Sequence, residues 1–308
     1  MRKLLSRKLR HDLLYWGAVL AVKIVKNIPR RIGITIFGWI GGLIYLFPAK
    51  DKENTSAHLR FIYGKHWSEK QIRQISRMVY VNLGKNLFDM IYLSQLPAQD
   101  FNKIVFHDSL DGFRNAYNRG KGVIVITAHT GCFEMLLHFF AIHGFRSFAI
   151  GRKMPDKRIE ELIRQNRSGE NIEYMDRTEG PLKVVRFLKE GKAFGVLIDQ
   201  DTQVESVFAD FLGHPSKTPS GPIKMAMKLG IPAFVVTTVR RPDNTHYVFL
   251  SEELTMVNTG SFEEDLVSNV IRANDLICKT IDQYPSQWVW MHRRWHHQPV
   301  DNSIGSIS

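Results

Sequence analysis

The chain has 308 residues, 44% of them hydrophobic, so it is long enough to bury a sizeable core and lacks the composition of a disordered protein. Its 42 Lys and Arg residues exceed its 30 Asp and Glu residues, and the net charge of +12 favours anionic partners such as membrane surfaces, nucleic acid or acidic carrier proteins. Two cysteines, Cys132 and Cys278, are too few and too far apart for a disulfide framework or a four-ligand zinc site, which favours a cytoplasmic location.

The first 48 residues combine basic and apolar segments. Residues 1–31 carry nine Lys and Arg side chains against one acid, Asp12, and the stretches 13–25 and 32–48 are apolar or small apart from Lys23. Neither stretch reaches the roughly 20 residues that a perpendicular bilayer span requires, so we expect residues 1–48 to attach the chain to a membrane, either lying in its interface or crossing it. A cleaved signal peptide fits poorly because Lys23 and Lys26 interrupt its apolar region. A pair of buried core helices is the alternative.

The rest of the chain, residues 49–308, is expected to form one domain, because it shows no internal repeat and no low-complexity linker. Its first part, residues 49–100, predicts helices. Ser68 and Gln71 have the spacing of a capping box, and apolar residues recur at helical spacing after them.

From residue 101 onward, short β-branched runs alternate with amphipathic segments. Strands are expected at 122–127, 148–151, 193–198, 233–239 and 247–250, and helices at 132–143, 156–167, 179–189, 219–229 and 262–284. This alternation predicts an α/β fold with a mixed, largely parallel central sheet flanked by helices. Ligands of such sheets gather beyond the carboxyl ends of the strands, where polar residues fall at 129–134, 151–152 and 199–201.

The first of these clusters contains a His and an acid separated by four residues. His129 follows a predicted strand, Gly131 permits a tight turn, and Glu134 falls at the start of the next helix. A His is suited to taking the proton of a hydroxyl nucleophile, and a carboxylate bonded to its other ring nitrogen would orient it. Backbone N–H groups at the start of the same helix would face an oxyanion or an anionic substrate group. A solvated loop histidine is the alternative.

Several segments together carry a family resemblance. They are 54–64, 129–134, 151–152 with 166–167, 199–201, 207–213 with Pro215 and Thr218, and 285–295. In this order, over nearly the whole chain, they resemble the bacterial lipid A late acyltransferases, which belong to the glycerolipid acyltransferase superfamily.

The resemblance implies an acyl-thioester-dependent O-acyltransferase of lipopolysaccharide biosynthesis. Such an enzyme moves a fatty acyl chain from acyl carrier protein, or another acyl thioester, to a hydroxyl of a lipid A precursor or similar glycolipid. It implies attachment to the bacterial inner membrane with the catalytic domain facing the cytoplasm. It implies no cofactor, no metal and no nucleic acid partner.

The resemblance also implies roles for particular residues. His129 and Glu134 would be catalytic, Arg152 and Arg167 would bind phosphate or carrier-bound pantetheine, and Asp199 would order the site's arginines or loops. Aromatic residues in the loop after Asp201 would line an acyl channel, and the basic, Trp-rich segment near the C-terminus would meet a headgroup or phosphorylated sugar. The expected substrate-binding residues are Gly151, Arg152, Arg167, Asp199, Gln200, Phe208, Phe211, Arg293 and Arg294.

One departure from the family pattern leaves alternatives open. The family usually has Gly-Asn-Trp before the acid, whereas this chain has Gly131, Cys132 and Phe133. Cys132 itself is a second candidate nucleophile, since a thiolate at a helix N-terminus has a lowered pKa. A metal hydrolase built from His129, Cys132, Glu134 and His138 is disfavoured because the His-Glu-x-x-His spacing is absent. An acyltransferase-fold protein acting on a different polar lipid, or a catalytically weak binding module, also remains open.

Overall fold

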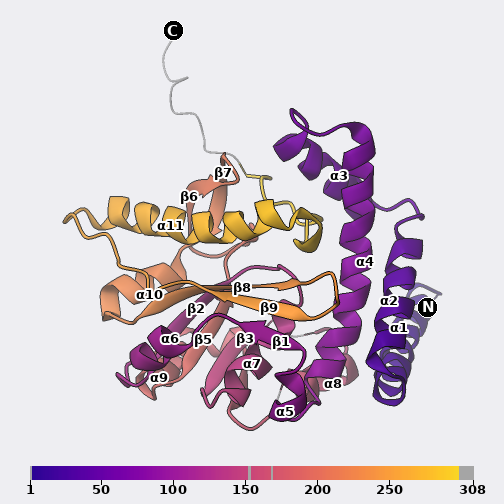
Figure 1. Cartoon of the computed structure of the whole chain (residues 1–308), viewed down its shortest axis with the longest axis horizontal. Helices are drawn as coiled ribbons and strands as arrows, with labels where there is room; N and C mark the ends of the chain where they lie inside the picture. Colours follow the sequence, from indigo (N-terminus) through magenta and orange to yellow (C-terminus); the bar gives the residue numbers. More distant parts are fainter. Residues whose placement is uncertain (1, 152–153, 168, 298–308) are drawn as a thin grey trace.

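The computed structural model describes residues 2–151, 154–167 and 169–297 (Figure 1). Its helices are α1 (Arg2–Asn27), α2 (Arg30–Ile44), α3 (Lys50–Tyr63), α4 (Glu69–Leu93), α5 (Ala98–Phe101), α6 (Asp111–Tyr117), α7 (Leu136–Ile142), α8 (Lys157–Arg167), α9 (Pro181–Lys189), α10 (Gly221–Leu229) and α11 (Phe262–Gln283). Short 3₁₀ turns are η1 (Phe133–Met135), η2 (Arg177–Glu179) and η3 (Pro285–Gln287). The strands are β1 (Val105–His107), β2 (Val123–Thr127), β3 (Ser147–Gly151), β4 (Ile172–Asp176), β5 (Ala193–Leu197), β6 (Ser206–Phe211), β7 (His214–Pro219), β8 (Ala233–Arg240) and β9 (His246–Leu250).

The main sheet has seven strands in the order β1-β9-β8-β2-β5-β3-β4. The ladders from β8 to β4 are parallel, and β9 pairs antiparallel with β8 and parallel with β1. The α/β fold with a largely parallel sheet flanked by helices is therefore confirmed. The five expected strands lie within one residue of their predicted bounds. The pattern missed β1 and β4, which are short or polar.

A second, two-stranded sheet was also missed. The segment that contains Phe208 and Phe211 was expected to be a loop, but it forms the antiparallel hairpin of β6 and β7. Leu212 and Gly213 form its two-residue turn and have positive φ angles of 55° and 77°, as the tight turns between antiparallel strands require.

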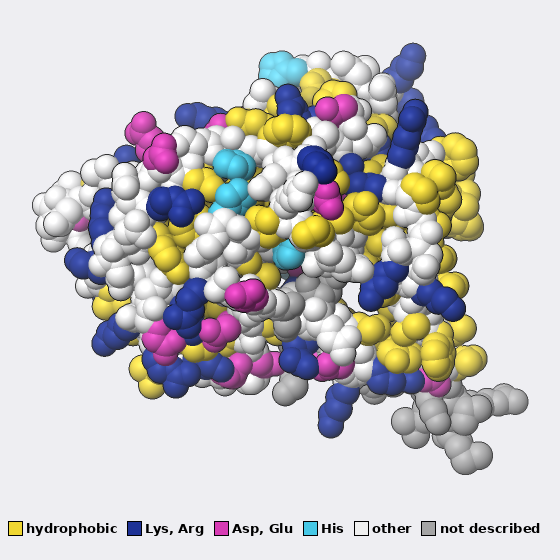
Figure 2. Space-filling view, turned by 60° about the horizontal axis from the view of Figure 1, so that its bottom comes forward, with side chains coloured by type: hydrophobic (Ala, Val, Ile, Leu, Met, Phe, Trp, Pro, Cys, Tyr) yellow, Lys and Arg dark blue, Asp and Glu magenta, His cyan; other side chains and the backbone are white. Residues whose placement is uncertain are grey.

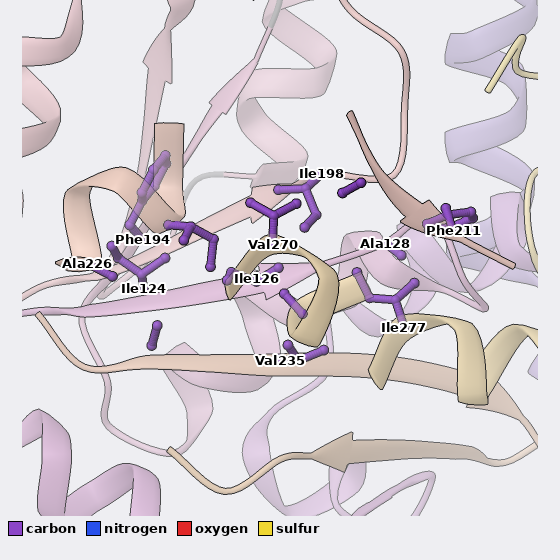
Figure 3. Close-up of a cluster of buried hydrophobic side chains, with 14 of the residues drawn as sticks. Ile124, Ile126, Ala128, Phe194, Ile198, Phe211, Ala226, Val235, Val270 and Ile277 are labelled. Atoms are coloured by element: carbon purple, nitrogen blue, oxygen red, sulfur yellow. The ribbon is translucent and has the colours of Figure 1, made fainter. Parts of the chain in front are cut away.

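The core lies on both faces of the sheet, because successive side chains of a strand point to opposite sides. Ile124 and Ile126 of β2 pack with Val270 and Ile277 of α11 on one face (Figure 3). Val123 and Val125 of the same strand belong to a second cluster, with residues of α6 and α7, on the other face. Burial of β2 on both faces explains its uninterrupted apolar sequence.

Helix α4 stands between the sheet and the N-terminal helix α2 (Figure 1). It begins with the predicted capping box, in which Ser68 and Gln71 bond each other's backbone N–H groups. Helices α2 and α4 approach closely at glycines: a Cβ on Gly41 would lie 2.1 Å from the Tyr80 carbonyl oxygen, and one on Gly84 would lie 2.1 Å from that of Phe37. Because both positions are glycine, the backbones of α2 and α4 come into direct contact.

Helices α1 and α2 each leave one side uncovered. Large apolar side chains are exposed there, among them Leu13, Trp16, Trp39 and Leu43 at 67%, 63%, 75% and 56%. Figure 2 shows hydrophobic side chains gathered along the right-hand edge of the molecule, with Lys and Arg side chains among them. Within the described residues, neither helix, nor any other, meets the length and hydropathy needed to span a membrane. The alternative of two wholly buried core helices is wrong, because only one side of α2 packs on α4.

Candidate active site

His129 and Asp199 meet because they follow neighbouring parallel strands. Strand β2 pairs with β5 in register up to Thr127 and Leu197, and each residue lies two positions beyond its strand. One Asp199 carboxylate oxygen accepts the His129 backbone N–H at 2.7 Å, and the other lies 2.8 Å from His129 Nδ1. The carboxylate therefore fixes both the ring and the backbone of His129.

The Asp199 carboxylate is fully buried. Burial alone would raise its pKa, but interactions with His129 and a hydrogen bond from Trp288 Nε1 at 2.7 Å hold the pKa well below its usual range. Asp199 therefore stays ionised throughout the neutral range, as a group that stabilises an imidazolium must.

Glu134 was expected to orient His129, and the structure gives that place to Asp199 instead. Both carboxylate oxygens of Glu134 face the guanidinium of Arg167, with Oε2 2.9 Å from Nε and a second contact from Nη2 to Oε1. Glu134 lies five residues after His129, beyond a tight turn, on η1, where its carboxylate faces Arg167 of α8. Asp199, 70 residues away in sequence, arrives beside His129 through strand pairing.

The outer nitrogen of the His129 ring faces Gln200. The Gln200 amide nitrogen lies 2.8 Å from His129 Nε2 and 2.5 Å from His292 Nε2. With the proton on Nδ1 shared with Asp199, His129 Nε2 has a free lone pair that accepts an amide N–H. Burial, and then the nearby His129, lower the pKa of His292 to about 4, so its imidazole is neutral at pH 7. The base-competent nitrogen is thus turned toward Gln200.

A cavity of about 680 Å³ opens beside this nitrogen. His129 and Gln200 are among the residues that line it, and apolar residues including Met175, Val184 and Val196 form much of the rest. Gly151, at the end of β3, also lines it, and a Cβ there would lie 1.7 Å from the Tyr174 hydroxyl oxygen. The cavity thus combines the polar side chains of His129 and Gln200 with a largely apolar lining, which suits a ligand with a long hydrocarbon chain.

The remaining expected residues are distributed differently. Phe211 is fully buried against Trp288 and Trp295, and Phe208 is partly exposed; neither lines the large cavity. Arg294 is also fully buried and bonds Lys217 O and Thr218 Oγ1, so it fastens β7 and offers no surface to a substrate.

The last two expected basic residues are Arg293 and Arg152. Arg293 is exposed. Arg152 lies outside the described residues.

Cys132 and Phe133, which depart from the pattern of the family that the sequence resembles, pack against neighbouring side chains. The Phe133 ring meets the His129 ring edge-on, with centroids 4.7 Å apart. Cys132 is 2% exposed, and burial raises the pKa of its thiol to about 12, which disfavours a thiolate nucleophile. Among the described residues, no three His, Cys, Asp or Glu side chains are grouped as a metal site would require.

The segment after α11 supports the His129 loop. The Gly131 N–H donates to Gln287 O at 2.9 Å, and the Val289 N–H donates to His129 O at 3.2 Å. Trp288 and His292 come from this segment and complete the surroundings of Asp199 and Gln200. In the sequence this segment is indicated only by the family resemblance and by its clustering of Trp with basic residues.

Comparison with known proteins finds related sequences. A family model described as bacterial lipid A biosynthesis acyltransferase matches residues 2–297. The chain is 24% identical over 268 residues to lipid A biosynthesis palmitoleoyltransferase of Escherichia coli strain K12, covering 86% of this chain and 85% of the relative. It is 19% identical over 283 residues to phosphatidylinositol mannoside acyltransferase of Mycolicibacterium smegmatis, covering 89% and 88%.

Solved structures show distant similarity. Among them is the crystal structure of the 1-acyl-sn-glycerophosphate acyltransferase PlsC from Thermotoga maritima, at 12% identity and a TM-score of 0.39, covering 83% of this chain and 99% of that chain.

Proposed function

The chain belongs to the bacterial lipid A biosynthesis acyltransferase family, and from that premise we propose that it moves a fatty acyl chain from acyl carrier protein, or another acyl thioester, to a hydroxyl of a lipid A precursor or similar glycolipid. The observation that carries this proposal is the His129–Asp199 pair, in which His129 lines the large, mainly apolar cavity. It combines a base for a hydroxyl with a place for a hydrocarbon chain.

In the proposed reaction the acceptor hydroxyl takes the place of the Gln200 amide at His129 Nε2. His129 removes the hydroxyl proton as the oxygen attacks the thioester carbonyl carbon, and Asp199 stabilises the imidazolium that forms. When the tetrahedral intermediate collapses, the C–S bond breaks and the imidazolium returns the proton to the departing sulfur. The products are an ester and a free thiol, and His129 is restored.

Arg167 has the role of holding an anionic group of a substrate, with Glu134 as its anchor. The paired oxygens of Glu134 and the Tyr174 ring, 5.2 Å from the guanidinium carbon, orient the Arg167 side chain. A guanidinium held in this way presents donors suited to phosphate. Arg152, next to Gly151 in the chain, is proposed to assist, and exposed Arg293 to meet the acceptor headgroup. Glu134 thus contributes to catalysis through Arg167.

Attachment to the cytoplasmic face of the bacterial inner membrane is proposed through the exposed sides of α1 and α2. Their apolar side chains are accompanied by exposed Lys23 and Lys26, and that combination binds anionic bilayer surfaces. The acceptor lipid would then reach the site from the membrane, and the soluble acyl donor from the cytoplasm.

The test is acyl transfer by the purified, detergent-solubilised full chain, followed by mass spectrometry of the lipid. Acyl carrier protein and coenzyme A thioesters are compared as donors with a lipid A precursor as acceptor. We expect the acceptor to gain one acyl mass, and His129→Ala to abolish the gain while the protein stays folded. Transfer by His129→Ala at the wild-type rate would contradict the mechanism.

A different polar lipid is the second candidate acceptor, because one relative of comparable coverage is named for acylating a phosphatidylinositol mannoside. Lipids extracted from cells with and without the intact gene distinguish the two. A missing acyl mass on lipid A favours the first acceptor, and one on another glycolipid favours the second.

A further inference from the structure

A buried polar network joins helix α2 to the loop that carries His129. Its members are Arg30 at the first position of α2, Asp89 and Asn86 on α4, and Arg240 at the end of β8. None of these residues lines the large cavity. The network therefore lies outside the cavity, but its last hydrogen bond reaches the loop that carries His129.

Asp89 is the centre of the network and is fully buried. Arg30 donates to both of its carboxylate oxygens, each at 2.8 Å, and Arg240 Nη1 donates to Oδ2 at 2.6 Å. His246 Nε2 lies 2.9 Å from the same oxygen. Burial alone would raise the pKa of Asp89, but its bonds to His246 and the two guanidiniums hold the pKa well below its usual range. The carboxylate is therefore ionised and fully engaged.

Asn86 carries the network to the catalytic loop. Its side-chain oxygen accepts from Arg240 Nη2 at 2.8 Å, and its side-chain nitrogen donates to the Gly131 carbonyl oxygen at 2.7 Å. Gly131 lies two residues after His129 at a φ of +51°, and a Cβ there would lie 2.3 Å from the Thr238 carbonyl oxygen. Its conformation is thus one that glycine alone adopts easily, and it needs support.

The charges make the network cooperative. Two guanidiniums share one buried carboxylate, so removing Arg30 or Asp89 leaves a buried charge without its full set of partners. Arg30 is the only member on the N-terminal helices. Its position is fixed because α2 packs on α4 at backbone distance through Gly41 and Gly84.

We infer that the series of hydrogen bonds Arg30–Asp89–Arg240–Asn86–Gly131 couples the membrane-facing helix α2 to the His129 loop. The catalytic geometry of that loop then requires α2 to be packed in place on α4. Arg30, Asp89, Arg240 and Asn86 are positioning residues for the proposed acyl transfer. The inference rests on the proposed function for its kinetic consequence, and on the structure alone for the coupling of α2 to the loop.

Arg30→Met and Arg31→Met are a matched pair for the test. Arg31 is the next residue of α2 and is exposed, whereas Arg30 binds Asp89. In the full chain in detergent, we expect Arg30→Met to lower kcat at least about tenfold with little change in KM, because a small displacement of a catalytic group is costly. Arg30→Lys, which keeps the charge without the fork, should recover part of the loss, and Arg31→Met should match the wild type.

Asn86→Asp breaks the last link while leaving an oxygen for Arg240. A carboxylate cannot donate to the Gly131 carbonyl, so kcat should again fall with KM retained. Equal kinetics for Arg30→Met and Arg31→Met, with His129→Ala inactive, would refute the coupling and leave the proposed function standing.

Hydrogen exchange gives a readout that does not depend on the reaction. We expect Arg30→Met to speed exchange of the backbone amides of residues 129–131 at least about tenfold over Arg31→Met, with exchange in α11 unchanged. Exchange at 129–131 that is identical in the two variants would overturn the inference even if no substrate were turned over. Acceleration throughout the chain would also overturn it, because the effect would then be general unfolding.

Discussion

The Asp199 carboxylate accepts hydrogen bonds from both the backbone N–H and the ring Nδ1 of His129, at 2.7 and 2.8 Å. One carboxylate thereby sets the position of the loop and the tautomer of the base.

Asp199→Asn should therefore lower kcat by about 10² to 10⁴, since an amide neither stabilises the imidazolium nor fixes the tautomer. Steady-state kinetics with saturating donor would measure the effect. Asp201→Asn is the control, because the Asp201 carboxylate faces His297 rather than His129. A kcat for Asp199→Asn within a few-fold of the wild type would exclude Asp199 as the partner of the base.

Arg167→Lys should raise KM for the phosphate-bearing substrate about tenfold or more and change kcat less, because a lysine cannot reproduce the two-point contact with Glu134. Arg164→Lys on the same helix serves as the control, since Arg164 pairs with the exposed Glu161. Measured KM values that rise equally in both variants would point to a general effect of α8.

Val196→Phe should shift the preferred donor toward shorter acyl chains, because Val196 lines the large cavity and the added ring would occupy part of it. Each methylene that no longer fits costs about 1–3 kcal/mol of discrimination. Met225→Ala enlarges the same cavity and should shift the preference toward longer chains. Competition between donors of different length, read by mass spectrometry, tests both; an unchanged profile in the two variants would place the donor chain elsewhere.

Trp39→Ala combined with Leu43→Ala should weaken binding to anionic vesicles at least about tenfold, because inserting each such side chain contributes about 1.5–3 kcal/mol. Thermal stability should be retained, since both side chains are exposed. Leu182→Ala is the control: Leu182 on α9 is 84% exposed but lies outside the N-terminal helices. Co-sedimentation of the full chain with vesicles gives the answer, and equal loss in the control would disprove attachment through α2.

Acidification should destabilise the fold through His292, whose pKa is lowered from 6.5 to about 4 chiefly by burial. Between these values the unfolded chain binds more protons than the folded one, so the free energy of unfolding falls as pH falls through this window. At pH 5 this histidine would account for at most about 2 kcal/mol of the loss. Urea unfolding at pH 7 and pH 5 should show a smaller loss for His292→Gln, and an unchanged one for exposed His66→Gln.

Sequence patterns located most of the sheet because its central strands are apolar on both faces. β2 and β8 are buried throughout, and such runs are recognisable without any partner. Strand β4, which carries Glu173 and Asp176, and the β6–β7 hairpin lie at the edge or apart, so their sequences alternate or are polar. Exposure of one face removes the signal that made the others predictable.

The sequence by itself determined the family, the α/β class and the place of His129 just beyond a buried strand, because these follow from the order of motifs and from apolar periodicity along the chain. Only the tertiary structure decided which acid serves His129. The ring direction depends on the turn at Gly131 and on the pairing of β2 with β5, and that pairing brings Asp199 to the ring while Glu134 turns to Arg167. Separation along the chain is no guide to such a contact, since neighbouring parallel strands end side by side however far apart they lie in sequence.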